Sequence, residues 1–180
     1  MKKFFVAALV AVIAMVASAQ DIYVGGSLGV WRNGSEHETT AAILPEIGYN
    51  LSEKASIGTT IGWRHDHTTG INTNIFQIAP YYRYNFFQTS MVNIFVDGGF
   101  GIGCGKTKYD GGESDTATIW NIGVRPGVSL NVNEHCSFVA HLGFLGYEGA
   151  NDAAKDAGYA DQWGLNLDAS AITFGFYYTF

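Results

Sequence analysis

The chain ends in Ala171-Ile172-Thr173-Phe174-Gly175-Phe176-Tyr177-Tyr178-Thr179-Phe180, where every second side chain is large and apolar. A period of two is that of a β-strand, because successive side chains of a strand point to opposite faces. One face of this strand is heavily aromatic, and the other carries mostly small or polar groups. A soluble sheet would bury the aromatic face. A strand whose outer side meets lipid needs the inverse arrangement, with the small and polar face inside.

The opposite end of the chain predicts secretion. A short basic region, Met1-Lys2-Lys3, precedes an uncharged apolar stretch over 4–16, and Ala17-Ser18-Ala19 has the form of a signal-peptide cleavage site. The apolar stretch is shorter than the roughly 20 residues of a transmembrane helix. We therefore expect residues 1–19 to be a signal peptide and 20–180 to be a single mature domain. The residue after the cleavage site is not Cys, so we expect no lipid anchor of the lipoprotein type.

Composition narrows the class of protein further. The formal charge is −6, or −8 once Lys2 and Lys3 are removed, which excludes a typical nucleic-acid binder. The chain has 23 Gly, 3 Pro and 14% aromatic residues, a composition that suits many short strands joined by turns. No apolar run after residue 19 approaches the length of a membrane helix. A secreted chain that enters a bilayer without such a helix must form a closed barrel, because closure satisfies every backbone polar group.

Short and long polar segments alternate along the chain and predict the number of strands. The short ones are Ser52-Glu53-Lys54, Gln88-Thr89-Ser90 and Asn133-Glu134-His135, which resemble hairpin turns. The long, Gly-rich ones cover about 32–39, 66–73, 106–115 and 148–163. This pattern predicts an all-β fold, an eight-stranded antiparallel up-and-down transmembrane β-barrel. Its strands are expected at about 21–31, 40–51, 55–65, 74–87, 91–105, 117–132, 136–147 and 165–180.

Parity along these strands assigns side chains to the lipid side or the interior. The outward register contains most of the large apolar groups, Phe144 among them, and also Pro45, Pro80 and Pro126. Because proline cannot donate a ladder hydrogen bond, we expect bulges or bends at these three positions. Cys104 and Cys136 fall near opposite ends of two strands, too far apart for the roughly 7 Å Cα limit of a disulfide. Two free thiols that act as small apolar residues are therefore expected, with a disulfide as the alternative, because secreted proteins often contain disulfides.

The inward register gathers the strand charges. Glu46, Arg64, Arg83, Asp97 and Arg125 are all expected to point into the barrel, and opposite charges in such an enclosure should pair. We interpret them as a structural polar network. A gated pore or proton path is the alternative, but an eight-stranded barrel is only wide enough for side chains to fill it.

These features together resemble the small bacterial outer-membrane β-barrel proteins of the OmpA/OmpX-like type. The resemblance covers 20–180 and rests on the architecture and the aromatic last strand. It implies that Phe176, Tyr178 and Phe180 are a signal for the outer-membrane assembly machinery. It also implies a multi-pass outer-membrane protein with both termini in the periplasm. The expected partners are membrane lipid, lipopolysaccharide and a host or surface protein ligand, and the expected state is a monomer. The implied role is structural or in surface interaction, with a narrow porin-like barrel as the alternative.

Catalysis, metal ions and cofactors are not expected. His135-Cys136-Ser137 resembles the His-x-Ser of barrel lipid A deacylases, which makes a lipid-modifying enzyme a further alternative, but it lies at an expected periplasmic turn and lacks an acidic partner. His37, His65 and His67 lie in or beside loops without a ligand spacing, and Asp152, Asp156 and Asp161 do not fit a calcium loop. Asp115-Thr116-Ala117 resembles the sequon that some Bacteroidetes use for O-glycosylation and would suggest such an origin.

Overall fold

The computed structural model describes residues 21–33, 38–68, 71–109, 112–113, 115–156, 159–166 and 172–180. The strands that line the wall are β1 (Ile22–Asn33), β2 (Glu38–Ser52), β3 (Ala55–Thr68), β4 (Ile71–Gln88), β5 (Val92–Tyr109), β7 (Ala117–Asn131), β8 (Cys136–His141), β9 (Phe144–Ala150), β10 (Gln162–Asn166) and β11 (Thr173–Thr179). A two-residue strand, β6 (Gly112–Glu113), and a short helix, α2 (Asp152–Asp156), belong to the connections. None of the helices in the described ranges has the length and apolar character needed to cross a membrane.

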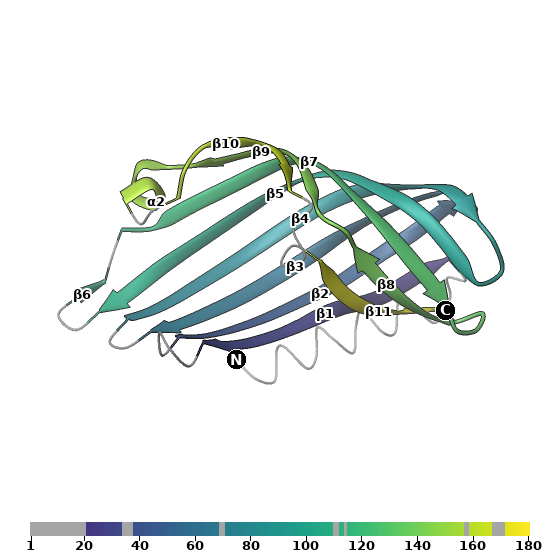
Figure 1. The fold of residues 1–180 in the computed structure, drawn as a ribbon, viewed down its shortest axis with the longest axis horizontal. Coiled ribbons are helices and arrows are strands. Elements are labelled where there is room, and N and C mark those ends of the chain that lie inside the picture. The colour runs from purple at the N-terminus through teal and green to yellow at the C-terminus, as the bar shows by residue number, and fades with distance from the viewer. Residues whose placement is uncertain are drawn as a thin grey trace.

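The strands form a closed antiparallel barrel with eight positions in its wall (Figure 1). Neighbours from β1 to β5 pair in chain order, and β7 follows β5. Both β8 and β9 pair with β7, so together they fill one position, and β10 and β11 fill the next. Closure comes from the pairing of β11 with β1, in which Tyr23 lies opposite Thr179 and Ser27 opposite Gly175.

The hairpin turns, the start of β1 and the end of β11 lie together at one end of the barrel, which we call the turn end. Ser52, Thr89 and Asn133 each accept backbone N–H groups within their own turn, through Oγ, Oγ1 and Oδ1. The N–H of Phe180 donates to the carbonyl of Ile22 at 3.0 Å, which brings the first strand and the last residue together there. The opposite end, with β6 and α2, is called the loop end (Figure 1). The predicted short turns are confirmed.

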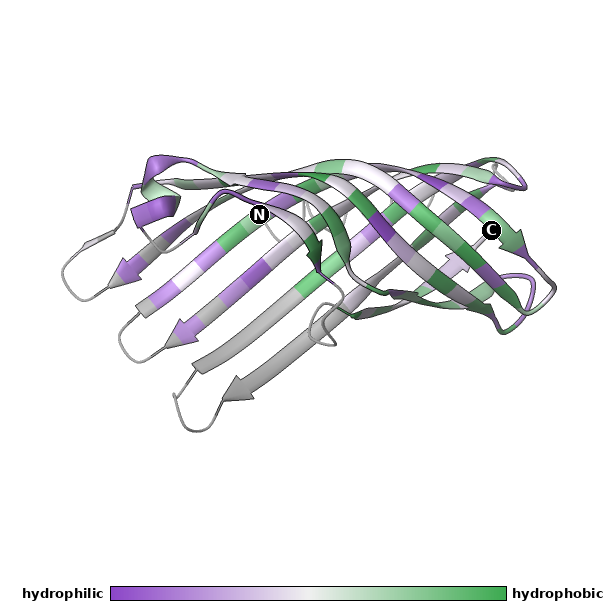
Figure 2. Ribbon diagram, turned by 45° about the horizontal axis from the view of Figure 1, so that its top comes forward, coloured by the Kyte–Doolittle hydropathy of each residue, from purple (hydrophilic) through white to green (hydrophobic). Residues whose placement is uncertain are grey.

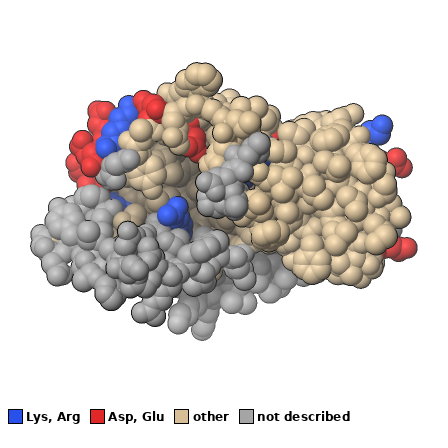
Figure 3. Space-filling model, in the orientation of Figure 1, with Lys and Arg blue, Asp and Glu red and all other residues tan. Residues whose placement is uncertain are grey.

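The wall shows the inside-out polarity that the last strand predicts. Large apolar side chains on the outer register are exposed, for example Phe76 at 57% and Phe100 at 57%, whereas inward Phe95 is 1% exposed. Among the coloured residues of Figure 2, hydrophobic ones dominate the half nearer the turn end. On the face shown in Figure 3 this half is a broad uncharged surface, with charges at its tip and around the loop end.

The seventh wall position departs from the prediction. A continuous strand over 136–147 was expected, but Leu142 and Gly143 separate β8 from β9, and Gly143 has a φ of 140°. The backbone conformation at Gly143 favours glycine and changes the register, because a one-residue slip exchanges the two faces of a strand. Leu145 and Tyr147 consequently face outward, and Phe144 lines interior cavities. The expected outward position of Phe144 is wrong.

In the last wall position, where a strand over 165–180 was expected, the structure describes β10 and β11, and residues 167–171 lie outside the described residues. The loop expected over 148–163 is shorter than predicted, because β9 continues to Ala150 and β10 begins at Gln162.

Pro45 and Pro80 keep the register of their ladders, contrary to the expected bulges, whereas the register shifts by one residue opposite Pro126. The register shifts in the ladders of β2 and β4 lie near the turns, between Asn50 and Ser52 and between Asn85 and Phe87. Pro45 and Pro80 instead lie at short gaps in one ladder, where the pairing resumes with its register unchanged. Pro126 lies opposite the break between β8 and β9, so its missing N–H falls where the ladder is already interrupted.

Candidate functional site

A layer of inward side chains crosses the barrel interior nearer the turn end than the loop end, since Arg83, which pairs with Asp97, lies five residues before the end of the 18-residue β4. Its aromatic part is a buried cluster of Tyr23, Tyr81, Phe95 and Tyr177, packed with Val139. Its charged part is Glu46, Arg83 and Asp97, which are also buried. The residues come from β1, β2, β4, β5, β8 and β11, all at positions where strand alternation points the side chain inward. We call this set, together with His141 of β8, the interior layer.

Arg83 is the centre of the interior layer. Its Nε donates to Asp97 Oδ1 at 2.7 Å and its Nη2 to Asp97 Oδ2 at 2.8 Å, a forked pairing that fixes both groups. The guanidinium carbon lies 4.0 Å from the ring centroid of Phe95, within cation–π range. Nη2 also lies 3.2 Å from the hydroxyl of Tyr177 and 3.4 Å from Glu46 Oε1. Arg83 therefore ties together both carboxylates and the aromatic cluster.

The second carboxylate, Glu46, is satisfied mainly by tyrosine hydroxyls. Tyr177 donates to Glu46 Oε1 at 2.5 Å, and Tyr81 donates to the same oxygen. The hydroxyls of Tyr23 and Tyr81 lie 2.6 Å apart, and the rings of Tyr23 and Tyr177 stack with centroids 5.4 Å apart. Glycine makes room for these rings, because a Cβ at Gly48 would collide with the ring of Tyr23 and one at Gly58 with that of Tyr81.

His141 completes the layer on the far side of Asp97. Its Nε2 lies 2.9 Å from Asp97 Oδ2, and its ring meets Phe95 edge-on with centroids 5.5 Å apart. Asp97 is 1% exposed and is thus enclosed by one arginine and one histidine. Such a charge is expensive to bury unless it is paired and hydrogen-bonded, and here it is both.

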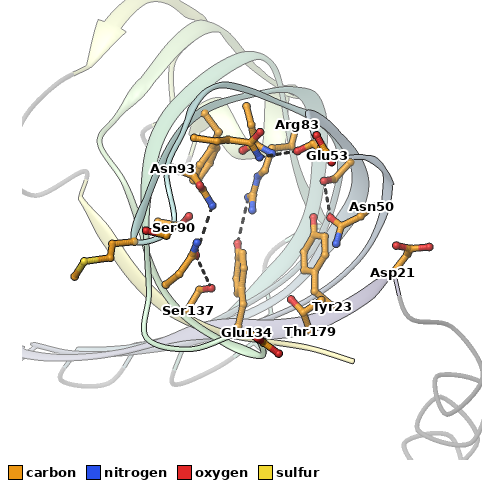
Figure 4. A pocket seen from close by; sticks show the side chains of 18 of the residues that line it. Asp21, Tyr23, Asn50, Glu53, Arg83, Ser90, Asn93, Glu134, Ser137 and Thr179 are labelled. Atoms are coloured by element: carbon orange, nitrogen blue, oxygen red, sulfur yellow. Dashed lines mark hydrogen bonds between the residues drawn. The ribbon is translucent and has the colours of Figure 1, made fainter.

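On the turn side of the layer lies a cavity of about 650 Å³, which we call the turn-side cavity. Its wall is rich in neutral hydrogen-bonding groups, and Figure 4 shows several of them pointing into it. Asn131 Oδ1 accepts from Ser137 Oγ at 3.0 Å and from Asn93 Nδ2 at 3.5 Å. Ser56 Oγ donates to Asn50 Oδ1 at 2.8 Å. Arg83, Tyr23 and Tyr177 lie at the boundary with the layer.

On the loop side lies a smaller cavity of about 210 Å³, the loop-side cavity, lined by Gln77, Asn121, Arg125, Phe144 and Glu148 among others. A neighbouring cavity of about 250 Å³ shares Phe144 and Glu148 and extends along β10. The interior layer thus lies between two polar spaces of different size.

The structure brings three of the five predicted network residues together, namely Glu46, Arg83 and Asp97. Arg125 lies opposite Asp97 in the β5–β7 ladder, yet its side chain lines the loop-side cavity, because Arg83 and His141 already occupy both Asp97 oxygens. Arg64 is exposed on β3 and does not belong to the layer. His141 was not among the residues expected in the network, and Glu148 was expected in the loop over 148–163.

The candidate catalytic pair does not form. His135 Nδ1 lies 2.8 Å from the carbonyl of Thr179, and its ring stacks on Tyr178, whereas Ser137 Oγ donates to Asn131. The two side chains therefore have separate partners, so His135 is not placed to act as a base for Ser137.

The candidate metal ligands have other partners or stand apart. His65 and His67 bond to Asn74 and Asn72 through Nδ1, at 2.9 and 2.8 Å. His37 lies outside the described residues. In the described part of the chain, no group of three His, Cys, Asp or Glu side chains is placed to hold a metal ion. Cys104 and Cys136 are free thiols, as expected.

Lys155 and Asp161 form an ion pair at the loop end, with Nζ and Oδ2 2.7 Å apart. The hydrogen bond from Lys155, helped by the N–H of Ala150, lowers the pKa of Asp161, and the same carboxylate raises the pKa of Lys155. This pair holds the segment after α2 against the end of β9.

Comparison with known proteins gives a consistent result. A model of the outer membrane protein beta-barrel domain family matches residues 4–180. The structure resembles the N-terminal barrel domain of Pseudomonas aeruginosa OprF, with a TM-score of 0.52 and 11% identity over 90% of this chain and 98% of that one. It also resembles Neisserial surface protein A, with a TM-score of 0.51 and 13% identity over 88% of this chain and 96% of that one. These likenesses concern the fold alone.

Among curated proteins, none matches the sequence. The family match covers nearly the whole chain, and the inside-out barrel has the polarity that a bilayer requires. The chain belongs to the outer membrane protein beta-barrel domain family, and its place is in the outer membrane.

Proposed function

We propose that the protein is a structural and surface-interaction barrel whose lumen is filled by side chains and whose loops meet ligands outside the cell. The observation that carries the proposal is the interior layer, in which four aromatic rings and a paired Arg83–Asp97 occupy the cross-section. An eight-stranded barrel has an interior just wide enough for side chains to fill it. The layer therefore leaves no open path for solutes, and function falls to the outer surface and loops.

The proposed orientation places the turn end in the periplasm and the loop end outside. Short periplasmic turns and longer outer loops are the usual arrangement in bacterial outer-membrane barrels. Both termini of the mature domain then lie in the periplasm, after removal of the expected signal peptide at 1–19. The exposed outer register contacts membrane lipid, and the loop end, with its charged residues around α2, meets lipopolysaccharide or a host or surface protein.

Delivery to the membrane is proposed to depend on the last strand. Phe176 and Tyr178 are exposed on the outside of β11, at 45% and 39%, and Phe180 ends the same register. Such an aromatic edge is open to recognition by the assembly machinery before the barrel closes, and its pairing with β1 then completes the wall. The barrel is proposed to act as a monomer.

Conductance in planar bilayers tests the filled lumen. The wild-type barrel is expected to be silent, and Tyr81→Ala/Tyr177→Ala is expected to conduct, because it removes two rings and both hydroxyls that bind Glu46. The matched control, Tyr82→Ala/Tyr84→Ala, removes two exposed outward rings of β4 and should stay silent. Gel mobility with and without boiling checks that each variant is folded. Steady channels in the wild-type protein would refute the filled lumen and support the alternative of a narrow pore.

Cysteine labelling in intact cells tests the orientation. In a Cys104→Ser/Cys136→Ser background, a membrane-impermeant maleimide is expected to label Asp156→Cys at the loop end. Glu134→Cys at the turn end should react only after the cells are opened. The reverse pattern would refute the proposed orientation while leaving the filled lumen intact.

A further inference from the structure

The loop-side cavity exists because the inward positions of β5 that follow Asp97 toward the loop end carry no side chain. These positions are Gly99, Gly101 and Gly103, and all three line the cavity. Gly123 of β7, which pairs with Gly99, adds a fourth. Since alternate residues of a strand share one face, this spacing leaves the interior empty of β5 side chains along three consecutive inward positions. Side chains fill the barrel at the interior layer, and the barrel is hollow immediately on the loop side of that layer.

Three polar side chains converge on this hollow without partners. Gln77 of β4 and both Asn121 and Arg125 of β7 line the cavity, and none of their side chains forms a hydrogen bond or ion pair in the part of the chain that the structure describes. All three residues are half-buried, so their polar groups remain open to a guest that enters the cavity. A guanidinium and two amides that face one space form a set of donors suited to an anionic group.

A carboxylate lines the same hollow on the side of β9. Glu148 lies opposite Asn121 in the β7–β9 ladder, and its Oε2 accepts a hydrogen bond from Gln162 at 2.5 Å. Within the described residues Glu148 and Arg125 form no ion pair, although both line the cavity. The hollow therefore contains one positive and one negative group held apart.

We propose that the loop-side cavity binds a small zwitterion, with its anionic group on Arg125 and its ammonium group on Glu148. The chemical class is that of an α-amino acid or of the phosphoethanolamine headgroup of a lipid. A simple anion would be repelled by Glu148 and a simple cation by Arg125, whereas a guest with both charges meets a partner at each end. Asn121 and Gln77 donate to the anionic group beside Arg125.

The size of the cavity fits such a guest. A volume of about 210 Å³ is below the roughly 300 to 1,000 Å³ of pockets for drug-sized ligands. Phe144 also lines the cavity, and an aromatic ring beside an ammonium group adds cation–π attraction. The neighbouring space of about 250 Å³, which shares Phe144 and Glu148, leaves room for the remainder of a larger guest. Phe144 faces this space because of the break at Gly143.

Ligand-observed NMR titrations of the purified barrel in a sugar-based, uncharged detergent test the proposal. The probes are phosphoethanolamine, L-alanine, inorganic phosphate and ethanolamine. The wild-type barrel should bind at least one zwitterion, and bind it more tightly than phosphate or ethanolamine. Arg125→Met and Glu148→Gln should each weaken this binding by about tenfold or more, because each removes a charge-assisted contact.

The two variants should also change preference in opposite directions. Glu148→Gln removes the repulsion of anions and should improve phosphate binding relative to wild type, whereas Arg125→Met should improve ethanolamine binding. Glu134→Gln, at the turn end and in the other cavity, is the matched control and should leave all four titrations unchanged. A folded wild-type barrel that binds neither zwitterion, or variants that bind both like the wild type, would overturn the proposal.

Nanodiscs distinguish the two sources of the guest. If a lipid headgroup occupies the cavity, soluble phosphoethanolamine should bind more weakly in nanodiscs of phosphatidylethanolamine than in nanodiscs of phosphatidylglycerol. If the guest is a free zwitterion, the two affinities should agree. The filled lumen is tested separately, by the conductance of the barrel, so failure of the present proposal would not contradict it.

Discussion

Arg83 and Asp97 lie directly opposite each other on β4 and β5, and their side chains meet inside the barrel through hydrogen bonds of 2.7 and 2.8 Å. Both side chains are almost completely buried, with exposures of 7% and 1%. Removing two charges from water is costly. Their mutual attraction offsets this cost when the geometry is good and their remaining hydrogen-bond donors and acceptors are satisfied. Losing one partner of this pair should therefore destabilise the barrel more than losing both.

Replacing Arg83 alone should strongly destabilise the barrel. Arg83→Met leaves Asp97 buried with His141 as its remaining partner, and breaking such a buried pair costs about 3–5 kcal/mol. Arg83→Met/Asp97→Leu removes both charges and should recover most of that loss. Urea unfolding of the barrel in lipid vesicles measures the difference. Equal midpoints for the single and double variants would show that the pair is not coupled.

His141 should contribute through its hydrogen bond to Asp97. His141→Phe keeps an aromatic ring beside Phe95 but loses the bond to a charged oxygen, a change worth about 1.5–3 kcal/mol. His141→Gln offers a replacement donor and should lose less. The same unfolding measurement checks the order, and a Phe variant as stable as wild type would mean that Arg83 alone satisfies Asp97.

Strand parity explains why most of the barrel could be predicted from the sequence. A period of two assigns every side chain of a strand to one face, so a few aromatic residues fix the rest. Parity puts Glu46, Tyr81 and Asp97 on the inner face, where they are buried, and Phe76 and Phe100 on the outer face, where they are exposed. The turns could also be predicted from the sequence, because the side chains of Ser52, Thr89 and Asn133 accept hydrogen bonds from the turn backbone.

The choice of Arg83 over Arg125 as the partner of Asp97 lies beyond sequence parity. Both arginines are in register with Asp97, one on each neighbouring strand. Packing decides between them, because the ring of Phe95 and the hydroxyl of Tyr177 receive the guanidinium of Arg83. Glycines at positions 99, 101 and 103 open a cavity on the other side, which Arg125 lines. Likewise, Gly143 gave a weak signal of the strand break that turns Phe144 inward.

The Lys155–Asp161 ion pair should make the loop end sensitive to acid. The pKa of Asp161 is lowered by the hydrogen bond from Lys155, so the pair stabilises the segment above the ordinary carboxyl pKa of 3.8. That stability is lost as the pH falls through the lowered pKa, where the carboxylate is protonated. The raised pKa of Lys155 keeps its ammonium charged throughout the neutral range.

Carboxyl NMR titration checks this prediction. Asp161 should titrate below 3.8 in the wild-type protein and move toward that value in Lys155→Met, although the N–H of Ala150 still donates to it. Lys54→Met at the turn end serves as the control and should leave the titration of Asp161 where it is. An unchanged titration in Lys155→Met would show that the pair does not persist in solution.

Glycine at position 48 should be essential for the packing of the interior layer. A Cβ at Gly48 would collide with the ring of Tyr23, whose hydroxyl lies 2.6 Å from that of Tyr81. Gly48→Ala should therefore displace Tyr23 and cost about 1–3 kcal/mol, as overpacking does. Gly98→Ala is the matched control on β5, because a Cβ there meets only Val124 Cγ1 at 3.9 Å, an ordinary contact. It should leave stability unchanged or raise it slightly, by reducing the freedom of the unfolded chain. Urea unfolding that ranks Gly98→Ala as the more damaging change would contradict this account of how the tyrosine rings fit against the wall.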